Sequence, residues 1–296
     1  MNKIKQIDSL IESLYTKKKY SELDALAILF SKSFLKKLEI ILNGDTINKS
    51  VYSNKYIVKS GWIDKIPVAE FINITYDIHS NHIKSRVELG DMLLVYEKSY
   101  KSKKNVPSNK KPLTNRAALI QAKLCDVENP LTPIGKMDKN RVTSTSKELA
   151  LLSNWPEFHL YKSGNSKDTI LQNIKLDANK PNRYFAGYFD KKWHIGEPIF
   201  NHQCKRTFGD LIMSLIENNS GEEFIQNDHS SNWNRLVNNV IKICNNSYLP
   251  FSIFNRRNKR LVSSNYLLSV IAFFFFFFPF GIARFHTLII HHRIEE

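Results

Sequence analysis

Residues 88–96 read Glu-Leu-Gly-Asp-Met-Leu-Leu-Val-Tyr, and residues 116–124 read Arg-Ala-Ala-Leu-Ile-Gln-Ala-Lys-Leu. Both segments are short apolar runs bounded by polar or turn-forming residues, which predicts two buried strands. Because side chains alternate along a strand, Gln121 and Lys123 should share one face. A buried amide and a buried ammonium group need polar partners, and Asp91 at the start of the first strand is the natural candidate. Such a group at one sheet edge can bind a hard divalent cation and act on a phosphodiester.

Gly90-Asp91 followed by Gln121-Ala122-Lys123 resembles the PD-(D/E)xK nuclease superfamily, in the variant where Gln replaces the second acidic residue. Restriction endonucleases of the Mrr type carry this Asp…Gln-x-Lys form. The resemblance implies that Asp91 binds Mg²⁺, that Gln121 helps to position the metal, and that Lys123 supports the attacking water. Glu88, three residues before Asp91, would add a further carboxylate to the metal site. For the acidic residue that the superfamily often carries on its first helix, three candidates remain open: Glu22, Asp24 and Glu39.

The same resemblance implies an α/β fold with a restriction-endonuclease-like mixed sheet flanked by helices. The function that follows is Mg²⁺-dependent hydrolysis of DNA phosphodiesters, in restriction or defence. The alternative is a non-catalytic nucleic-acid-binding or scaffold protein of the same fold. A homodimer is compatible with either function.

Composition favours a polyanionic partner. The 296 residues carry a formal net charge of +15, with nucleic acid as the first candidate partner and an anionic membrane surface as the second. An AT-rich genome, which enriches Lys and Asn, is the competing explanation for this charge. The three cysteines are scattered without a CxxC pair, which argues against a disulfide framework and fits a cytoplasmic location.

The N-terminal half is expected to be helical first and then β-rich. Apolar residues at helical spacing predict a helix over residues 3–16, and Ser21 should begin a second helix that runs to about Leu42. Alternating apolar and polar residues over 72–78 predict a strand with one solvent-facing side. The segment from Glu97 to Asn115 is expected to be a loop, and its lysines would contact nucleic-acid phosphates: Lys101, Lys103, Lys104 and Lys110.

Residues 146–152 predict a short helix whose Lys147 and Glu148 face water. Trp155 and Phe158, which follow it, are expected to pack in the core rather than to stack on bases. Two later helical patterns, over residues 207–216 and from Ser231, predict a helical C-terminal cap.

The end of the chain has a different composition. An uncharged run over residues 261–283 includes six consecutive phenylalanines and follows a basic cluster, which is typical of a membrane span. A frameshifted ending and a buried hydrophobic element are the two alternatives, and membrane association is expected only if the run is a true span. Because the matched strands precede it, a chain ending near Pro250 is expected to fold. The sequence thus divides into N-terminal helices, α/β core, cap and tail: 1–50, 51–160, 161–250 and 251–296.

Overall fold

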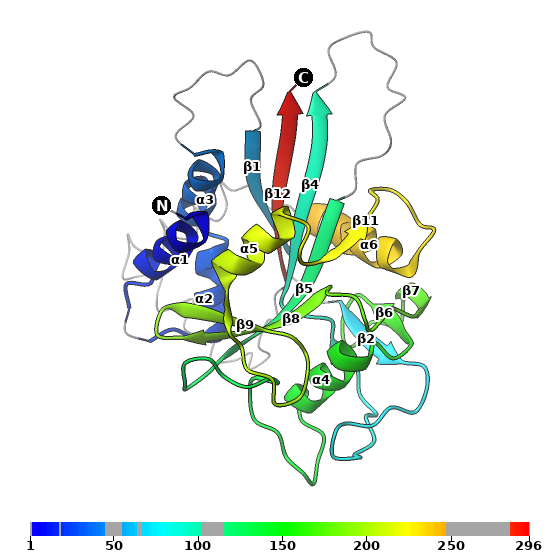
Figure 1. Ribbon diagram of the computed structural model, residues 1–296. Coiled ribbons are helices and arrows are strands. Elements are labelled where there is room, and N and C mark those ends of the chain that lie inside the picture. The colour runs from blue at the N-terminus through cyan, green and yellow to red at the C-terminus, as the bar shows by residue number, and fades with distance from the viewer. Residues whose placement is uncertain are drawn as a thin grey trace, which may run out of the picture.

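The computed structural model describes residues 2–17, 19–44, 55–63, 67–101, 115–246 and 285–295. This part of the chain is a mixed α/β structure in which helices flank a curled mixed sheet, with a smaller antiparallel sheet beside it (Figure 1). The α/β class expected from the sequence is therefore confirmed.

The main sheet has eight described strands. Its hydrogen-bonded order is β1, β12, β4, β5, β8, β9 and β10, with β11 also paired to β5. Strands β4 and β5, which follow each other along the chain, are antiparallel, whereas β8 runs parallel to β5 and β12 runs parallel to β4. The bounds are β1 Lys55–Ile63, β4 Met92–Lys101, β5 Asn115–Leu124, β8 Arg183–Phe189, β9 Lys192–Gly196, β10 Arg206–Thr207, β11 Glu222–Phe224 and β12 Phe285–Glu295.

Side-chain alternation divides the core into two clusters, one on each face of this sheet. Leu94 and Ile120 point to one face, where four helices cover them: α1 (Lys3–Leu14), α2 (Glu22–Leu29), α3 (Lys32–Asn43) and α5 (Phe208–Ile216). Leu93 and Leu119 point to the other face, where α4 (Ser144–Asn154), α6 (Asn232–Asn246) and the second sheet pack. The two C-terminal helices α5 and α6 therefore lie on opposite faces of the main sheet.

The N-terminal region contains three helices rather than the expected two: α1 Lys3–Leu14, α2 Glu22–Leu29 and α3 Lys32–Asn43. Ser21 does begin α2, because its side chain accepts a hydrogen bond from the amide of Asp24. The expected long helix is wrong because Ser31 breaks it. The Ser31 hydroxyl caps a new helix by accepting from the amide of Phe34 at 3.1 Å. Gly44, at φ 68°, ends α3.

The strand predicted over residues 72–78 does not form. Strand β2 (Val68–Phe71) ends just before it, and β3 (Val87–Glu88) begins well after it. The carboxylate of Asp77 accepts hydrogen bonds from the amides of His79 and Asn81, each at 2.9 Å, so the chain turns here instead of extending. The alternating apolar side chains are left on the surface, with Ile74 70% exposed and Tyr76 56% exposed.

Strands β2 and β3 belong to the second sheet, which β6 (Phe158–Tyr161) and β7 (Thr169–Ile174) complete in the order β3, β2, β6, β7. Trp155 is 2% exposed and Phe158 fully buried, so the prediction that both lie in the core is confirmed. The main sheet draws strands from both sides of residue 160, because β8 and β9 extend it beyond β5.

The described end of the chain is a strand within the main sheet. Strand β12 pairs antiparallel with β1 on one side and parallel with β4 on the other. Its Leu288 and Ile290 are fully buried. The uncharged run over 261–283, which contains the six phenylalanines, lies outside the described residues, and so does the membrane span expected there. Within the part of the chain that the structure describes, none of the helices has the length and apolar character needed to cross a membrane.

Candidate active site

Asp91 and Gln121 meet where β4 begins and β5 approaches its end. The amide of Asp91 donates to the carbonyl of Ile120 over 2.9 Å, which draws the turn before β4 against β5. A Cβ atom on Gly90 would lie 3.1 Å from that same carbonyl oxygen, so the close approach suits a glycine. Oδ2 of Asp91 then accepts two hydrogen bonds, from Nε2 of Gln121 at 2.5 Å and from the amide of Ala122 at 2.8 Å.

Lys123 lies on the same face of β5 as Gln121, because the two residues are separated by one position. Its Nζ lies 3.2 Å from Oε1 of Glu148 on α4. Glu148 is only 2% exposed, so the expectation that it faces water is wrong. Helix α4 is buried on most of its circumference, and apolar residues flank Glu148 on its C-terminal side: Leu149, Ala150, Leu151 and Leu152.

Two further carboxylates lie around this group. Glu22, the first residue of α2, is hydrogen-bonded to the backbone of Leu124, and its charge acts on both Lys123 and Asp91. The charge of Glu88, which is half-buried on β3, also acts on Asp91. Of the other two helical candidates, Asp24 is exposed and Glu39 accepts a hydrogen bond from the amide of Val58 at 3.1 Å. Glu22 is thus the member of the three that the fold brings to Asp91 and Lys123.

Burial controls the protonation of these groups. It raises the pKa of Asp91 well above its ordinary value, although the positive charge of Lys123 partly opposes the effect. Burial also raises the pKa of Glu148 and the pKa of Glu22, again against attraction to Lys123. Although burial disfavours the charged form of Lys123, attraction to Glu148, Asp91 and Glu22 raises the pKa of its ammonium overall. Lys123 is therefore positive at neutral pH, while the carboxyls retain protons more readily than exposed ones.

Two oxygen atoms at this site lack a hydrogen-bond partner among the described residues: Oε1 of Gln121 and Oε2 of Glu148. Both atoms are buried acceptors, and oxygen acceptors are the ligands that Mg²⁺ and Ca²⁺ prefer. The described residues contain no group of three or more His, Cys, Asp or Glu side chains arranged to hold a metal ion. A cation here would have to combine carboxylate oxygens with the amide oxygen of Gln121. Carboxylate oxygens combined with the Gln121 amide oxygen suit a hard divalent cation.

The four lysines predicted to contact phosphates lie at or beyond the last described residue of β4. Lys101 is the last residue of β4, and its side chain is not described. Lys103, Lys104 and Lys110 lie outside the described residues. Their role in nucleic-acid binding stays a prediction.

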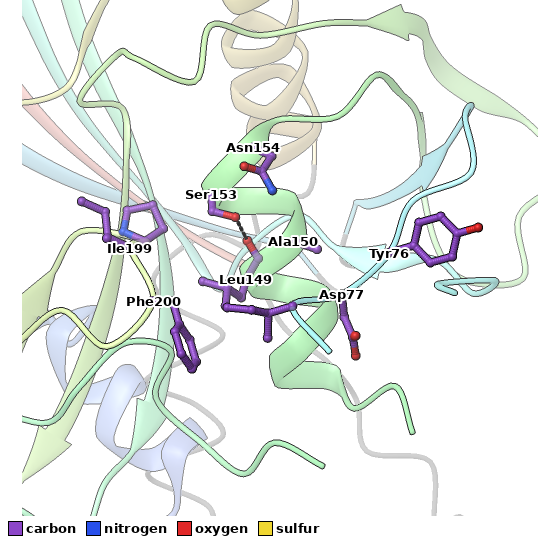
Figure 2. Close-up of a pocket in the computed structure, with 10 residues that line it drawn as sticks. Tyr76, Asp77, Leu149, Ala150, Ser153, Asn154, Ile199 and Phe200 are labelled. Carbon is purple, nitrogen blue, oxygen red and sulfur yellow. Dashed lines mark hydrogen bonds between the residues drawn. The ribbon is translucent and has the colours of Figure 1, made fainter. Parts of the chain in front are cut away.

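A shallow groove on α4 does not include the polar residues of this site. Its floor is made by Leu149, Ala150, Ser153 and Asn154, and the loops that carry Tyr76 and Phe200 stand on either side of the helix (Figure 2). Neither Asp91 nor Glu148 lines it. Its one carboxylate, that of Asp77, is already held by backbone amides.

Glu148 is the site residue that sequence reasoning missed. One signal could have found it, since Glu148 is followed directly by Leu-Ala-Leu-Leu in a helix with few polar positions left to face water. The comparisons with known proteins add no assignment: no family model, no curated protein and no solved structure matches the chain.

Proposed function

We propose that this chain is a metal-dependent nuclease that hydrolyses DNA phosphodiesters with Mg²⁺, on a restriction-endonuclease-like core. The observation that carries the proposal is the convergence of Asp91, Gln121 and Lys123. The first two are joined by a buried hydrogen bond between adjacent strands, and the third shares the face of Gln121. A mixed sheet with helices on both faces is compatible with such a core. The C-terminal cap of this proposal would consist of α5 and α6, one on each face of the sheet.

In this function each side chain has a separate role. Asp91 and Gln121 would hold the metal through oxygen atoms, and the orphaned Oε1 of Gln121 leaves one such atom free. When bound, Mg²⁺ polarises the phosphoryl oxygen and lowers the pKa of its coordinated water. The ammonium group of Lys123, which is positive at neutral pH, would orient the attacking water and stabilise negative charge that develops on the phosphate.

The substrate class follows from charge. A net charge of +15 favours a polyanion, and a duplex presents phosphates to lysines without requiring base contacts. DNA is proposed as the substrate, with RNA as an outcome that the assay can separate. A cytoplasmic location is part of the same proposal. So is a homodimer, because a duplex has two strands to cut.

The experiment is a cleavage assay with the full chain on supercoiled plasmid and on labelled RNA and DNA oligonucleotides, with Mg²⁺ or with EDTA. Asp91→Asn keeps the shape of the side chain but removes its charge, and it should lower cleavage on the order of 100-fold or more, since even indirect partners of metal sites matter 10–100-fold. Asp168→Asn is the matched control, because Asp168 is exposed. Thermal melting of each variant establishes that it is folded.

Cleavage that is equally strong in EDTA or in Asp91→Asn would refute the proposal. Salt-sensitive DNA binding without cleavage would instead support the second candidate, a non-catalytic nucleic-acid-binding protein. The observation that favours this candidate is Gln121 itself, since an amide leaves fewer negative charges to hold a metal than the acid of the usual pattern.

A further inference from the structure

Glu148 is buried as deeply as the apolar residues around it, yet only half of its carboxylate is used. Oε1 forms the ion pair with Lys123, while Oε2 has no partner among the described residues. Taking a carboxylate out of water is costly, and one ion pair offsets that cost only if the remaining lone pairs are also satisfied. The ion pair with Lys123 therefore leaves the position of Glu148 unexplained.

A second side chain has the same deficiency. Gln121 is fully buried, and its Nε2 is used by Asp91, but its Oε1 has no partner. Gln121 and Lys123 lie two positions apart on one face of β5, and Lys123 contacts Glu148, so Lys123 links the two side chains that carry the unsatisfied oxygens. Two buried acceptors without a donor suit a cation and would repel an anion.

The charges explain why a second carboxylate is needed. Asp91 supplies one negative charge and Gln121 supplies none, so a divalent cation held by this pair would be only half compensated. Glu148 supplies the missing charge from α4. The two other carboxylates nearby, Glu22 and Glu88, are each half-buried rather than fully buried. Glu22 is also hydrogen-bonded to the backbone of Leu124.

We propose that Glu148 is the second acidic ligand of the divalent cation, and that α4 thereby supplies the charge that Gln121 on β5 lacks. This inference rests on the proposed function. In it, Oε2 of Glu148 and Oε1 of Gln121, the two acceptors without partners, would join Asp91 in holding the cation. The ion pair with Lys123 holds the Glu148 carboxylate in place beforehand. With a cation bound to Glu148, the ammonium group of Lys123 would be free to interact with the phosphate.

The test measures metal binding by the full chain without DNA, by titration calorimetry with Mn²⁺ and Mg²⁺ and by the rise in melting temperature that each ion causes. Glu148→Gln should weaken binding by about 10-fold or more. The exchange Gln121→Glu with Glu148→Gln moves the charge from the helix to the strand and should restore most of the affinity. Glu157→Gln is the matched control, because Glu157 follows the same helix and lies outside the site.

The outcomes separate this inference from the function on which it rests. If Asp91→Asn loses the cation but Glu148→Gln binds it as well as wild type, Glu148 is no ligand and the inference is overturned. If Glu148→Gln loses binding and the double variant Gln121→Glu with Glu148→Gln regains none of it, the inference is also overturned. An acid on α4 would then not be equivalent to an acid on β5. If wild type binds neither ion, or if Asp91→Asn binds both normally, the metal-dependent function itself fails.

Melting without metal shows whether each variant folds. Should Glu148→Gln not fold, Glu148→Asp keeps the charge but draws the carboxylate back by one methylene group. It should bind the cation more weakly than wild type, and unchanged affinity would again overturn the inference.

Discussion

Gln121 donates its side-chain amide to Oδ2 of Asp91 over 2.5 Å, so that the two central strands are joined by side chains as well as by their backbones. The same oxygen accepts from the amide of Ala122 at 2.8 Å. Asp91 is 5% exposed and Gln121 is fully buried, so these bonds are shielded from water. Because a buried donor that loses its partner bears the full cost of desolvation, this contact stabilises the local fold as well as arranging the site.

Gln121→Glu should destabilise the metal-free protein at pH 8. Two carboxylates would replace a donor and an acceptor, and like charges this close cannot both ionise. We expect the free energy of unfolding to fall by about 1–3 kcal/mol, measured by urea denaturation in EDTA. At pH 5 a shared proton can replace the lost amide hydrogen, so the difference should shrink. Gln172→Glu, at an exposed position, is the control and should change stability by less than about 0.5 kcal/mol.

The buried carboxyls of the site should make the metal-free protein less stable as pH rises from 5 to 8. Burial raises the pKa of Asp91, of Glu148 and of Glu22, so the folded state binds more protons than the unfolded state between the ordinary and the raised values. Ionisation of these groups therefore disfavours the folded state progressively as pH increases. Hydrogen bonds outweigh desolvation and lower the pKa of Asp77, but this stabilising contribution changes only below its ordinary value of 3.8 and is complete above pH 5.

Urea denaturation at several pH values measures this trend, and Glu148→Gln should flatten it because one carboxyl with a raised pKa is removed. Lys123 stays charged throughout the window, since the pKa of its ammonium is raised by its acidic neighbours despite burial. Burial lowers the pKa of His194, which opposes the trend over the same range, so the comparison with Glu148→Gln is decisive. The same pH dependence in wild type and in Glu148→Gln would contradict the prediction.

Replacing Lys101, Lys103, Lys104 and Lys110 together by Ser should weaken the dependence of DNA affinity on salt. Each phosphate contact that is lost lowers the slope of log K against log salt by about 0.9, because fewer condensed counterions are released. Fluorescence anisotropy with a labelled duplex at several salt concentrations measures the slope. A control with equal net charge replaces four exposed lysines elsewhere: Lys5, Lys136, Lys167 and Lys180. If both variants give the same slope, Lys101, Lys103, Lys104 and Lys110 reflect overall composition and not a binding surface.

A chain that ends near Pro250 should fail to fold, contrary to the expectation from sequence. Removing β12 would leave β1 and β4 without their shared neighbour and expose the core around Leu288 and Ile290. Leu288→Ala and Ile290→Ala should each lower the free energy of unfolding by about 2–5 kcal/mol. Ile74→Ala, at a 70% exposed position, is the control. A truncated chain with a cooperative unfolding transition would show that β12 is dispensable.

Local sequence determined the features of this protein that depend on interactions between residues close together in the chain. The alternation in residues 116–124 correctly placed Gln121 and Lys123 on one face of β5, since strand periodicity depends only on backbone geometry. The hydroxyl of Ser21 and the backbone freedom of Gly44 set helix ends for the same reason. The juxtaposition of Asp91 and Gln121 was also foreseen, because two apolar strands that follow each other along the chain commonly pair in an antiparallel manner.

Tertiary structure decided the features that depend on distant partners. From sequence, Glu148 is expected to be an exposed helical acid, but α4 packs it beside Lys123. Helical periodicity could not assign Glu148 to a face, because α4 is buried on nearly every side. Residues 72–78 alternate like a strand, but none of the described strands pairs with them and Asp77 turns the chain. Strand β12 enters the sheet beside β4, although some 190 residues separate them along the chain, as the pairing of His286 with Met92 shows. A polar or apolar pattern in the sequence indicates whether a side chain favours burial or solvent. Which residues surround that side chain is decided only when the chain packs.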